Sequence, residues 1–265
     1  MIRVRALTKN YGDNAVLRGV DLDAAAGEFV VVLGESGAGK STLLRCMNRL
    51  VVADGGELRL GQMDAVTCSD ERALRRQVAM IFQHHHVVPR LTALKNVLTG
   101  CLGSVSTLAS VFHLFPRKDI ELARECLARV GLAHKAEART DSLSGGQMQR
   151  VGIARALAQR PQVILADEPV ASLDPQAARK VLQYLRDASR DLGITVLCNL
   201  HQVDYAKEFA DRIVGLARGR VVFDGLPADL GAADIDRIYL QPPEPVAPAQ
   251  SPAPRASSQV AANLG

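Results

Sequence analysis

The sequence predicts an α/β fold whose core is a mostly parallel β-sheet. The run Phe29–Leu33 is continuous, apolar and rich in valine, which is typical of a strand buried on both faces. Three further runs of this kind follow it, at Val163–Leu165, Thr195–Leu197 and Ile213–Leu216. Helical patterns separate these runs, as expected when helices join the strands of a parallel sheet.

Two segments depart from this alternation and predict further parts of the fold. Ile2–Leu7 and Val20–Asp23 alternate apolar and polar residues, so we expect half-exposed strands of an N-terminal antiparallel β subdomain. Residues from about 87 to 160 show helical periodicity without a buried strand run, which predicts a helical subdomain inserted into the core. Residues 1–240 are thus expected to form one domain. Residues 241–265 are rich in Pro, Ala, Ser and Gln, and this composition predicts a disordered tail.

The composition argues against a nucleic-acid partner and against a membrane-spanning chain. The net charge of +4 comes from scattered basic residues and tryptophan is absent, so neither a basic tract nor a base-stacking surface is indicated. The longest apolar run, Phe29–Leu33, is far shorter than the ~20 residues of a membrane helix, and no apolar signal segment opens the sequence. We therefore expect any membrane role to act through a partner. The five cysteines are widely spaced with no Cys-x-x-Cys pair, which predicts reduced thiols in the cytosol.

A glycine-rich segment directly after the first buried run predicts a phosphate-binding loop. Gly34–Ser41 fits the pattern G-x-x-x-x-G-K-S and precedes the helical pattern Thr42–Arg45, which is the context that such a loop requires. Its glycines let backbone N–H groups surround phosphate, Lys40 can reach the β- and γ-phosphates, and Ser41 can bind Mg²⁺. The residues expected to contact the nucleotide here are Gly34, Glu35, Ser36, Gly37, Ala38, Gly39, Lys40, Ser41 and Thr42.

Two carboxylates end the second buried run. Asp167 and Glu168 follow Val163–Ala166, and the carboxyl ends of parallel strands face the ligand crevice of such a sheet. We expect Asp167 to hold Mg²⁺ through water and Glu168 to act as general base on the attacking water. Pro169 rigidifies the turn that follows them.

A second glycine pair precedes a helix in the middle of the chain. In Leu143–Gln147, Ser144 is a plausible N-cap for a helix over Gln147–Gln159, and Gly145 and Gly146 allow phosphate to approach the end of that helix. Taken alone, this pattern also fits an ordinary capped helix.

Together the three motifs resemble, in order and spacing, the Walker A, signature and Walker B motifs of ATP-binding-cassette (ABC) ATPases. Four more positions match the family. Tyr11 matches the aromatic residue that stacks on adenine, and Gln83 matches the glutamine loop. Asp174 matches the D-loop, and His201 matches the switch histidine. The resemblance covers about residues 2–225 and implies a P-loop NTPase core that hydrolyses ATP with Mg²⁺.

The resemblance also implies roles for individual residues. It assigns catalysis to Glu168, His201 and Gln83, and the Mg²⁺ site to Ser41, Gln83 and Asp167. It adds to the nucleotide contacts of the phosphate loop the residues Tyr11, Ser144, Gly145, Gly146, Gln147 and Asp174. His84, His85 and His86 follow Gln83 and could suggest a metal site, but no carboxylate or cysteine cluster joins them. We expect them to be loop residues near a membrane partner.

The implied assembly is a head-to-tail homodimer in which each ATP lies between one phosphate loop and the partner's signature motif. Family members of this kind energise two transmembrane permease subunits at the cytoplasmic face of the bacterial inner membrane, together with a periplasmic substrate-binding protein. The resemblance implies these partners and this location here.

Four segments are most similar to the ATPases of phosphonate importers: Leu102–Leu108, Leu114–Arg117, Val170–Asp174 and Asn199–Ala206. This similarity implies uptake of phosphonates or phosphite. An importer of another solute, such as phosphate, an amino acid or methionine, remains an alternative. A soluble ABC ATPase without a transport role is disfavoured, because the chain has one cassette, no extended heptads and no basic tract.

Overall fold

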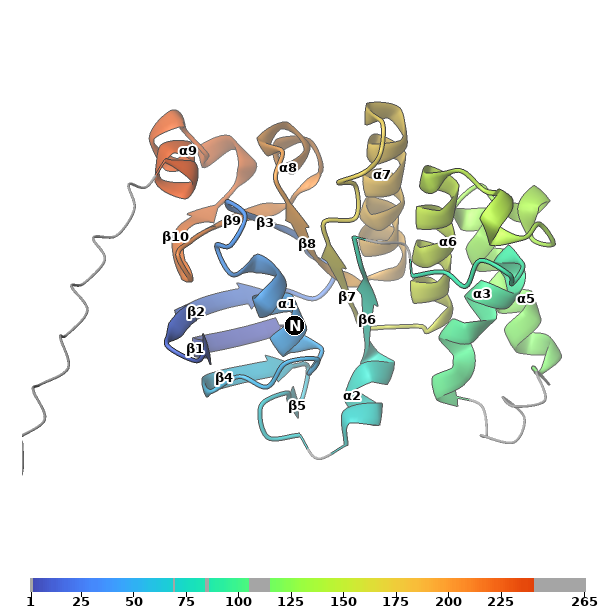
Figure 1. The fold of residues 1–265 in the computed structure, drawn as a ribbon, viewed down its shortest axis with the longest axis horizontal. Coiled ribbons are helices and arrows are strands. Elements are labelled where there is room, and N and C mark those ends of the chain that lie inside the picture. The colour runs from blue at the N-terminus through green and yellow to red at the C-terminus, as the bar shows by residue number, and fades with distance from the viewer. Residues whose placement is uncertain (1, 69, 84–85, 105–114, 241–265) are drawn as a thin grey trace, which may run out of the picture.

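The computed structural model describes residues 2–68, 70–83, 86–104 and 115–240, and its strands form two sheets (Figure 1). The four-stranded sheet is antiparallel, with the order β2 (Asn14–Ala24), β1 (Ile2–Tyr11), β4 (Gly55–Leu60) and β5 (Met63–Asp64). The six-stranded sheet has the order β10 (Arg220–Gly225), β9 (Arg212–Ala217), β3 (Phe29–Leu33), β8 (Thr195–Leu200), β7 (Val163–Asp167) and β6 (Val78–Ile81). Its strands run parallel apart from β10, which is antiparallel to β9. The predicted α/β fold with an antiparallel β subdomain is therefore confirmed.

The central strand β3 is buried on both faces, as its continuous apolar run predicts. Phe29, Val31 and Leu33 belong to one hydrophobic core, whereas Val30 and Val32 belong to another. All five side chains are fully inaccessible to solvent. The six-stranded sheet therefore separates two cores, one on each face.

Helix α1 (Lys40–Met47) lies between the two sheets. Its buried residues Leu43, Leu44 and Met47 share a core with Val4 of the antiparallel sheet and Val32 of the parallel sheet. Because α1 is held from both sides, the loop that leads into it has a fixed position relative to both sheets. This packing places the phosphate loop.

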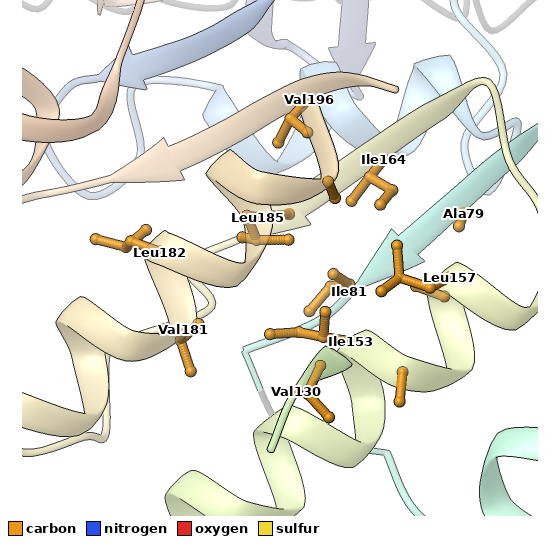
Figure 2. Packing of buried hydrophobic residues seen from close by; sticks show 14 of the residues in the cluster. Ala79, Ile81, Val130, Ile153, Leu157, Ile164, Val181, Leu182, Leu185 and Val196 are labelled. Carbon is orange, nitrogen blue, oxygen red and sulfur yellow. The ribbon is translucent and has the colours of Figure 1, made fainter. Parts of the chain in front are cut away.

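Helices α6 (Gly145–Ala158) and α7 (Pro175–Leu192) contribute to the second core, against β6, β7 and β8 (Figure 2). Ile153 of α6 and Leu185 of α7 are fully buried with Ile164 of β7 and Val196 of β8. Each such side chain contributes about 1.5–3 kcal/mol relative to exposure. The predicted helix Gln147–Gln159 begins two residues earlier, because Ser144 caps it.

The helices α3 (Ala93–Leu98) and α5 (Arg117–Arg129) gather with α6 at one end of the molecule (Figure 1). The fully buried Asn96 fastens this region: its Oδ1 accepts from Val88 N–H at 2.7 Å, and its Nδ2 donates to Thr140 Oγ1 at 3.2 Å. These helices fall within the segment that the sequence predicts to be helical. Residues 105–114 of that segment, and the predicted tail 241–265, lie outside the described residues.

The remaining elements are short. They are the helices α2 (Glu71–Gln77), α8 (Val203–Phe209) and α9 (Ala232–Tyr239), with the 3₁₀ turns η1 (Thr99–Ser104), η2 (Ala133–Lys135), η3 (Thr140–Ser142) and η4 (Pro227–Asp229). The sequence did not predict β4, β5, β6 and β10 as strands. Partly exposed residues weaken the apolar pattern of β4, β5 and β10, and β6 is apolar but has only four residues. Within the described ranges, every helix is too short or too polar to cross a bilayer.

Candidate nucleotide-binding site

The glycines of the phosphate loop are required by the close approach of neighbouring backbone. A Cβ atom at Gly34 would lie 2.3 Å from the carbonyl oxygen of Leu216, and one at Gly39 would lie 2.9 Å from that of Val16. Gly39 also has a φ of 105°, which side-chain-bearing residues rarely adopt. It stands at the N-cap of α1 and provides no side-chain cap, so the first N–H groups of the helix can bind phosphate oxygens.

Lys40 is held inside this loop. Its ammonium group donates hydrogen bonds to the carbonyl oxygens of Gly34, at 2.6 Å, and Glu35, at 2.9 Å. The residue is only 4% exposed. Burial lowers the pKa of Lys40, although the nearby carboxylates of Glu168, Asp167 and Glu35 oppose this shift. The cation is thus desolvated and faces the acidic end of β7, which suits the binding of a polyphosphate.

Asp167 and Ser41 meet where β7 ends and α1 begins. The Ser41 hydroxyl donates to Oδ1 of Asp167 at 2.7 Å, and Nδ2 of Asn199 donates to the same oxygen at 2.9 Å. Asp167 is only 6% exposed. Hydroxyl and carboxylate oxygens are the ligands that Mg²⁺ prefers, so this pair fits a magnesium site.

Asn199 belongs to this cluster, but sequence reasoning did not single it out. It lies on β8, and its register partner is Asp167 on the parallel neighbour β7. Its Oδ1 is buried without a hydrogen-bond partner among the described residues. A free polar atom of this kind, beside the proposed ligands, is a second feature that fits a bound group. An asparagine inside an apolar strand run is the signal that could have identified it.

Glu168 and His201 pair at the same sheet edge. Nε2 of His201 lies 2.6 Å from Oε1 of Glu168, and the two residues follow the adjacent strands β7 and β8. Glu168 has a φ of 50°, a left-handed conformation that is strained for a residue with a side chain. Such strain is concentrated at functional sites, and here it aims the carboxylate toward His201. The structure therefore brings together two residues predicted to be catalytic.

Tyr11 ends β1 at the hairpin that leads into β2, and it is 49% exposed. The Lys9 ammonium lies 5.5 Å from the centroid of its ring. The second strand of the hairpin touches the phosphate loop, because Val16 is the residue that crowds Gly39. The exposed ring is thus carried on the same hairpin that borders the loop, as adenine stacking would require.

Gln83 follows β6 by two residues and is exposed. Ile81 of β6 pairs with Ala166 of β7, which places Gln83 at the edge that carries Asp167 and Glu168. The role of Gln83 in metal binding and catalysis stays a prediction. Beyond it, His84 and His85 lie outside the described residues, and the ring of His86 packs edge-on against Phe82 with centroids 4.7 Å apart.

The signature motif forms a separate surface. Ser144 Oγ accepts from Gln147 N–H at 3.3 Å, and Gln147 Oε1 accepts from Ser144 N–H at 3.0 Å, so the pair closes a capping box at α6. Asp174 caps α7 by accepting from Gln176 N–H and Ala177 N–H, both at 3.0 Å. A pocket of about 300 Å³ lies between the two helix starts. The described residues that line it are Ser144, Gly145, Gly146, Arg150, Ser172, Leu173, Asp174, Gln176, Ala177 and Lys180.

The pocket at the signature motif contains no residue of the phosphate loop among those that line it. The nucleotide contacts predicted from the sequence are thus divided between two places. One is the edge of the parallel sheet, with the phosphate loop, Asp167, Glu168 and His201. The other is the start of α6, with Ser144 and the two glycines. Among the described residues of one chain, this pocket therefore does not bring the phosphate loop and the signature motif together.

Comparison with known proteins agrees with this geometry. The model of a family described as "ABC transporter" matches residues 17–171. A phosphonates import ATP-binding protein, PhnC of Thiobacillus denitrificans, is 54% identical over 241 residues, covering 90% of this chain and 92% of that protein. The phosphite import ATP-binding protein PxtA of Stutzerimonas stutzeri is 54% identical over 240 residues, covering 90% and 87%.

A solved structure gives the same fold. A dimeric ATP-binding cassette in a post-hydrolysis state, bound to ADP and Pi, superposes with a TM-score of 0.74 at 32% identity, covering 86% of this chain and 99% of that one. The matched family, the extent of identity over nearly the whole described chain and the shared fold lead to one conclusion. The chain belongs to the ABC transporter family, as an ATPase subunit.

Proposed function

We propose that this chain is the ATP-hydrolysing subunit of a bacterial importer for phosphonates or phosphite. The observation that carries the proposal is the cluster at the carboxyl edge of β3, β7 and β8. There a desolvated Lys40, the Ser41–Asp167 pair and the Glu168–His201 pair lie together. The substrate class rests on two relatives of 54% identity, whose names give phosphonate and phosphite import.

In the proposed mechanism the backbone N–H groups at the start of α1 and the Lys40 ammonium bind the β- and γ-phosphates. The adenine base of the bound nucleotide stacks on the exposed ring of Tyr11. Ser41, Asp167 and Gln83 would hold Mg²⁺, which neutralises charge on the phosphates when it is bound. Asn199 orients the Asp167 carboxylate by donating to its Oδ1.

Glu168 accepts a proton from the attacking water, whose oxygen bonds to the γ-phosphorus while the bond to the β–γ bridging oxygen breaks. ADP and inorganic phosphate are the products. His201 Nε2, which contacts Glu168 Oε1, holds this carboxylate in place and can reach the γ-phosphate side of the site. Asp167 and Asn199 lie on the adjacent parallel strands β7 and β8, and Glu168 and His201 directly follow these strands, so the sheet preorganises the geometry.

The proposed assembly is supported by the separation of the phosphate loop from the signature motif within one chain. Two copies arranged head to tail would place each phosphate loop against the partner's Ser144, Gly145 and Gly146. ATP would close this dimer, and hydrolysis would reopen it. We further propose two permease subunits and a periplasmic substrate-binding protein as partners. The ATPase would lie on the cytoplasmic face of the inner membrane, held there by the permeases.

The domain organisation belongs to this proposal. Residues 1–240 would form the nucleotide-binding domain, with residues of about 87–160 as the inserted helical subdomain, and the region around Gln83 would transmit motion to the permeases. Residues 241–265 would form a disordered tail.

The function is tested by growth of the source bacterium, with this gene deleted, on a phosphonate, phosphite or phosphate as sole phosphorus source. We expect loss of growth on the phosphonate or phosphite alone, with rescue by the wild-type gene and not by Glu168→Gln. Loss of growth on phosphate alone, or rescue by Glu168→Gln, would contradict the proposal. A strain that lacks other phosphonate and phosphite uptake genes keeps a redundant importer from masking the defect.

A further inference from the structure

The last described helix, α9, lies directly against the nucleotide edge of the parallel sheet. Its residue Ile238 is 2% exposed, and a Cβ atom at Gly215 of β9 would lie only 2.5 Å from Ile238 Cδ1. Gly215 is the register partner of Leu33, the residue that precedes the phosphate loop. The glycine therefore lets α9 approach the backbone at the point where β3 ends.

The next residue of α9, Tyr239, reaches the catalytic edge. Its hydroxyl donates a hydrogen bond to the carbonyl oxygen of His201 at 2.9 Å. The ring is partly buried and packs against the hydrophobic core that includes Ile213 of β9 and Ile238 of α9. Burial raises the pKa of Tyr239, so the phenol stays protonated and can donate at neutral pH.

This contact acts on a junction with few other restraints. His201 follows the end of β8, and α8 begins only at Val203. The strand ladder ends at Leu200, whose register partner is Leu33. The Tyr239 hydroxyl therefore restrains the His201 backbone just beyond the last paired residue, while the His201 ring contacts Glu168.

We propose that Tyr239 is a positioning residue for ATP hydrolysis, which fixes the backbone of His201 so that its ring holds the Glu168 carboxylate. The inference rests on the proposed function, since positioning matters only if the site hydrolyses ATP. It makes α9 part of the catalytic apparatus, although α9 lies beyond all the nucleotide-binding motifs in the sequence. Removing the hydroxyl would leave α9 docked through Ile238 and free the His201 carbonyl.

The test uses the full chain and compares Tyr239→Phe with Tyr205→Phe. Tyr205 lies on α8, close to His201 in sequence, with its ring 5.5 Å from the Arg179 guanidinium. Tyr205→Phe is the matched control, because it also removes one tyrosine hydroxyl. We expect Tyr239→Phe to lower kcat about 3- to 10-fold, the effect of one neutral hydrogen bond. KM and the Kd for ATP should change less than about 2-fold, because the phosphate contacts remain. Tyr205→Phe should behave as wild type.

A double-mutant cycle with His201→Ala separates positioning from a general structural role. Single-turnover rates, with enzyme in excess over ATP, make the slow His201→Ala background measurable. If Tyr239 acts through His201, adding Tyr239→Phe to His201→Ala causes no further loss. The same loss in both backgrounds, or an equal loss in Tyr205→Phe, would overturn the inference.

A second measurement does not depend on hydrolysis. The chain has six histidines, so the imidazole NMR signal of His201 can be identified by its disappearance in His201→Ala. We expect Tyr239→Phe to move this signal and to leave the remaining histidine signals in place. An unmoved His201 signal would refute positioning. A wild-type chain that hydrolyses no ATP would instead refute the proposed function, whatever the NMR result.

Discussion

Nε2 of His201 lies 2.6 Å from Oε1 of Glu168, although 33 residues separate them in the sequence. The pair exists because β7 and β8 are parallel neighbours that end at the same edge of the sheet. Glu168 accepts a left-handed backbone conformation to make this contact. The proposed catalytic edge of the protein is therefore a product of strand order.

Replacing the proposed general base should separate binding from hydrolysis. Glu168→Gln keeps the size of the side chain and removes its capacity to accept a proton, so we expect hydrolysis to fall by about 10²–10⁴-fold. ATP binding should persist, because the phosphate loop is intact, and the ATP-bound variant should be dimeric. Steady-state ATPase assays and size-exclusion chromatography with ATP check both points. Glu208→Gln, which alters an exposed carboxylate paired with Arg179, is the control. A Glu168→Gln protein that is fully active, or monomeric with ATP, would contradict the assignment.

Adding one methyl group to the phosphate loop should weaken nucleotide binding. In Gly34→Ala the new Cβ would lie 2.3 Å from the Leu216 carbonyl oxygen, so the loop must move away from β9. We expect the Kd for ATP to rise more than about tenfold, with a lower Tm. The atom that the new Cβ meets belongs to the backbone, which cannot move aside without distorting the sheet. The control is Gly231→Ala, where the nearest atom to the new Cβ is 3.6 Å away. Unchanged ATP binding in Gly34→Ala would show that the loop does not hold the phosphates.

The ion pair between Arg186 and Asp211 should make stability depend on pH. Burial alone would raise the pKa of Asp211, but its hydrogen bonds with Arg186 and with Phe29 N–H outweigh burial and lower it. A lowered pKa in the folded state adds stability that is present above the unfolded pKa of about 3.9 and is lost as pH falls through the folded value.

Asp211→Asn should therefore destabilise the protein by about 1–2 kcal/mol at pH 7, a figure reduced because the Asp211 side chain is 39% exposed. Urea unfolding at pH 7 and at successively lower pH measures the difference from wild type. We expect this difference to shrink below a pH of about 4. A difference that grows with acidity would have the wrong sign for this ion pair.

The thiols should differ in reactivity according to burial. Burial raises the pKa of Cys46 to about 11 and that of Cys126 to about 12. Cys101 and Cys198 are also buried, and all five cysteines are free, as their spacing predicts. We expect iodoacetamide at pH 8 to modify the half-buried Cys68 first in the native protein, and all five thiols in urea. Rapid native modification of Cys46 or Cys126, detected by mass spectrometry, would contradict the packing around α1 or α5.

The local structure of the motifs proposed to bind phosphate could be predicted, because each motif is local. The phosphate loop needs only a strand, its glycines and the start of a helix, and all three lie within Phe29–Met47. The position of Asp167 and Glu168 at a strand end follows in the same way from one apolar run. The helix at Ser144 was predicted by its capping pattern, which involves only Gln147 and the backbone between.

The contacts between motifs could not be predicted in this way. Asn199 reads as one polar residue in an apolar strand until β8 is paired with β7, which brings its amide to Asp167. Tyr239 lies 38 residues beyond His201, in a helix outside every recognised motif. The weak strands β6 and β10 were missed for a related reason, because their formation depends on neighbours already present in the sheet.

The sequence by itself determined the fold class, the family and the positions of the motifs proposed to bind phosphate, because these depend on periodicity and short motifs that each segment carries alone. Only the tertiary structure decided which side chains face one another at the edge of the sheet. Strand order and the approach of α9 bring Asn199 to Asp167, His201 to Glu168 and Tyr239 to His201. These contacts form between segments that are distant in the chain, so no local pattern encodes them.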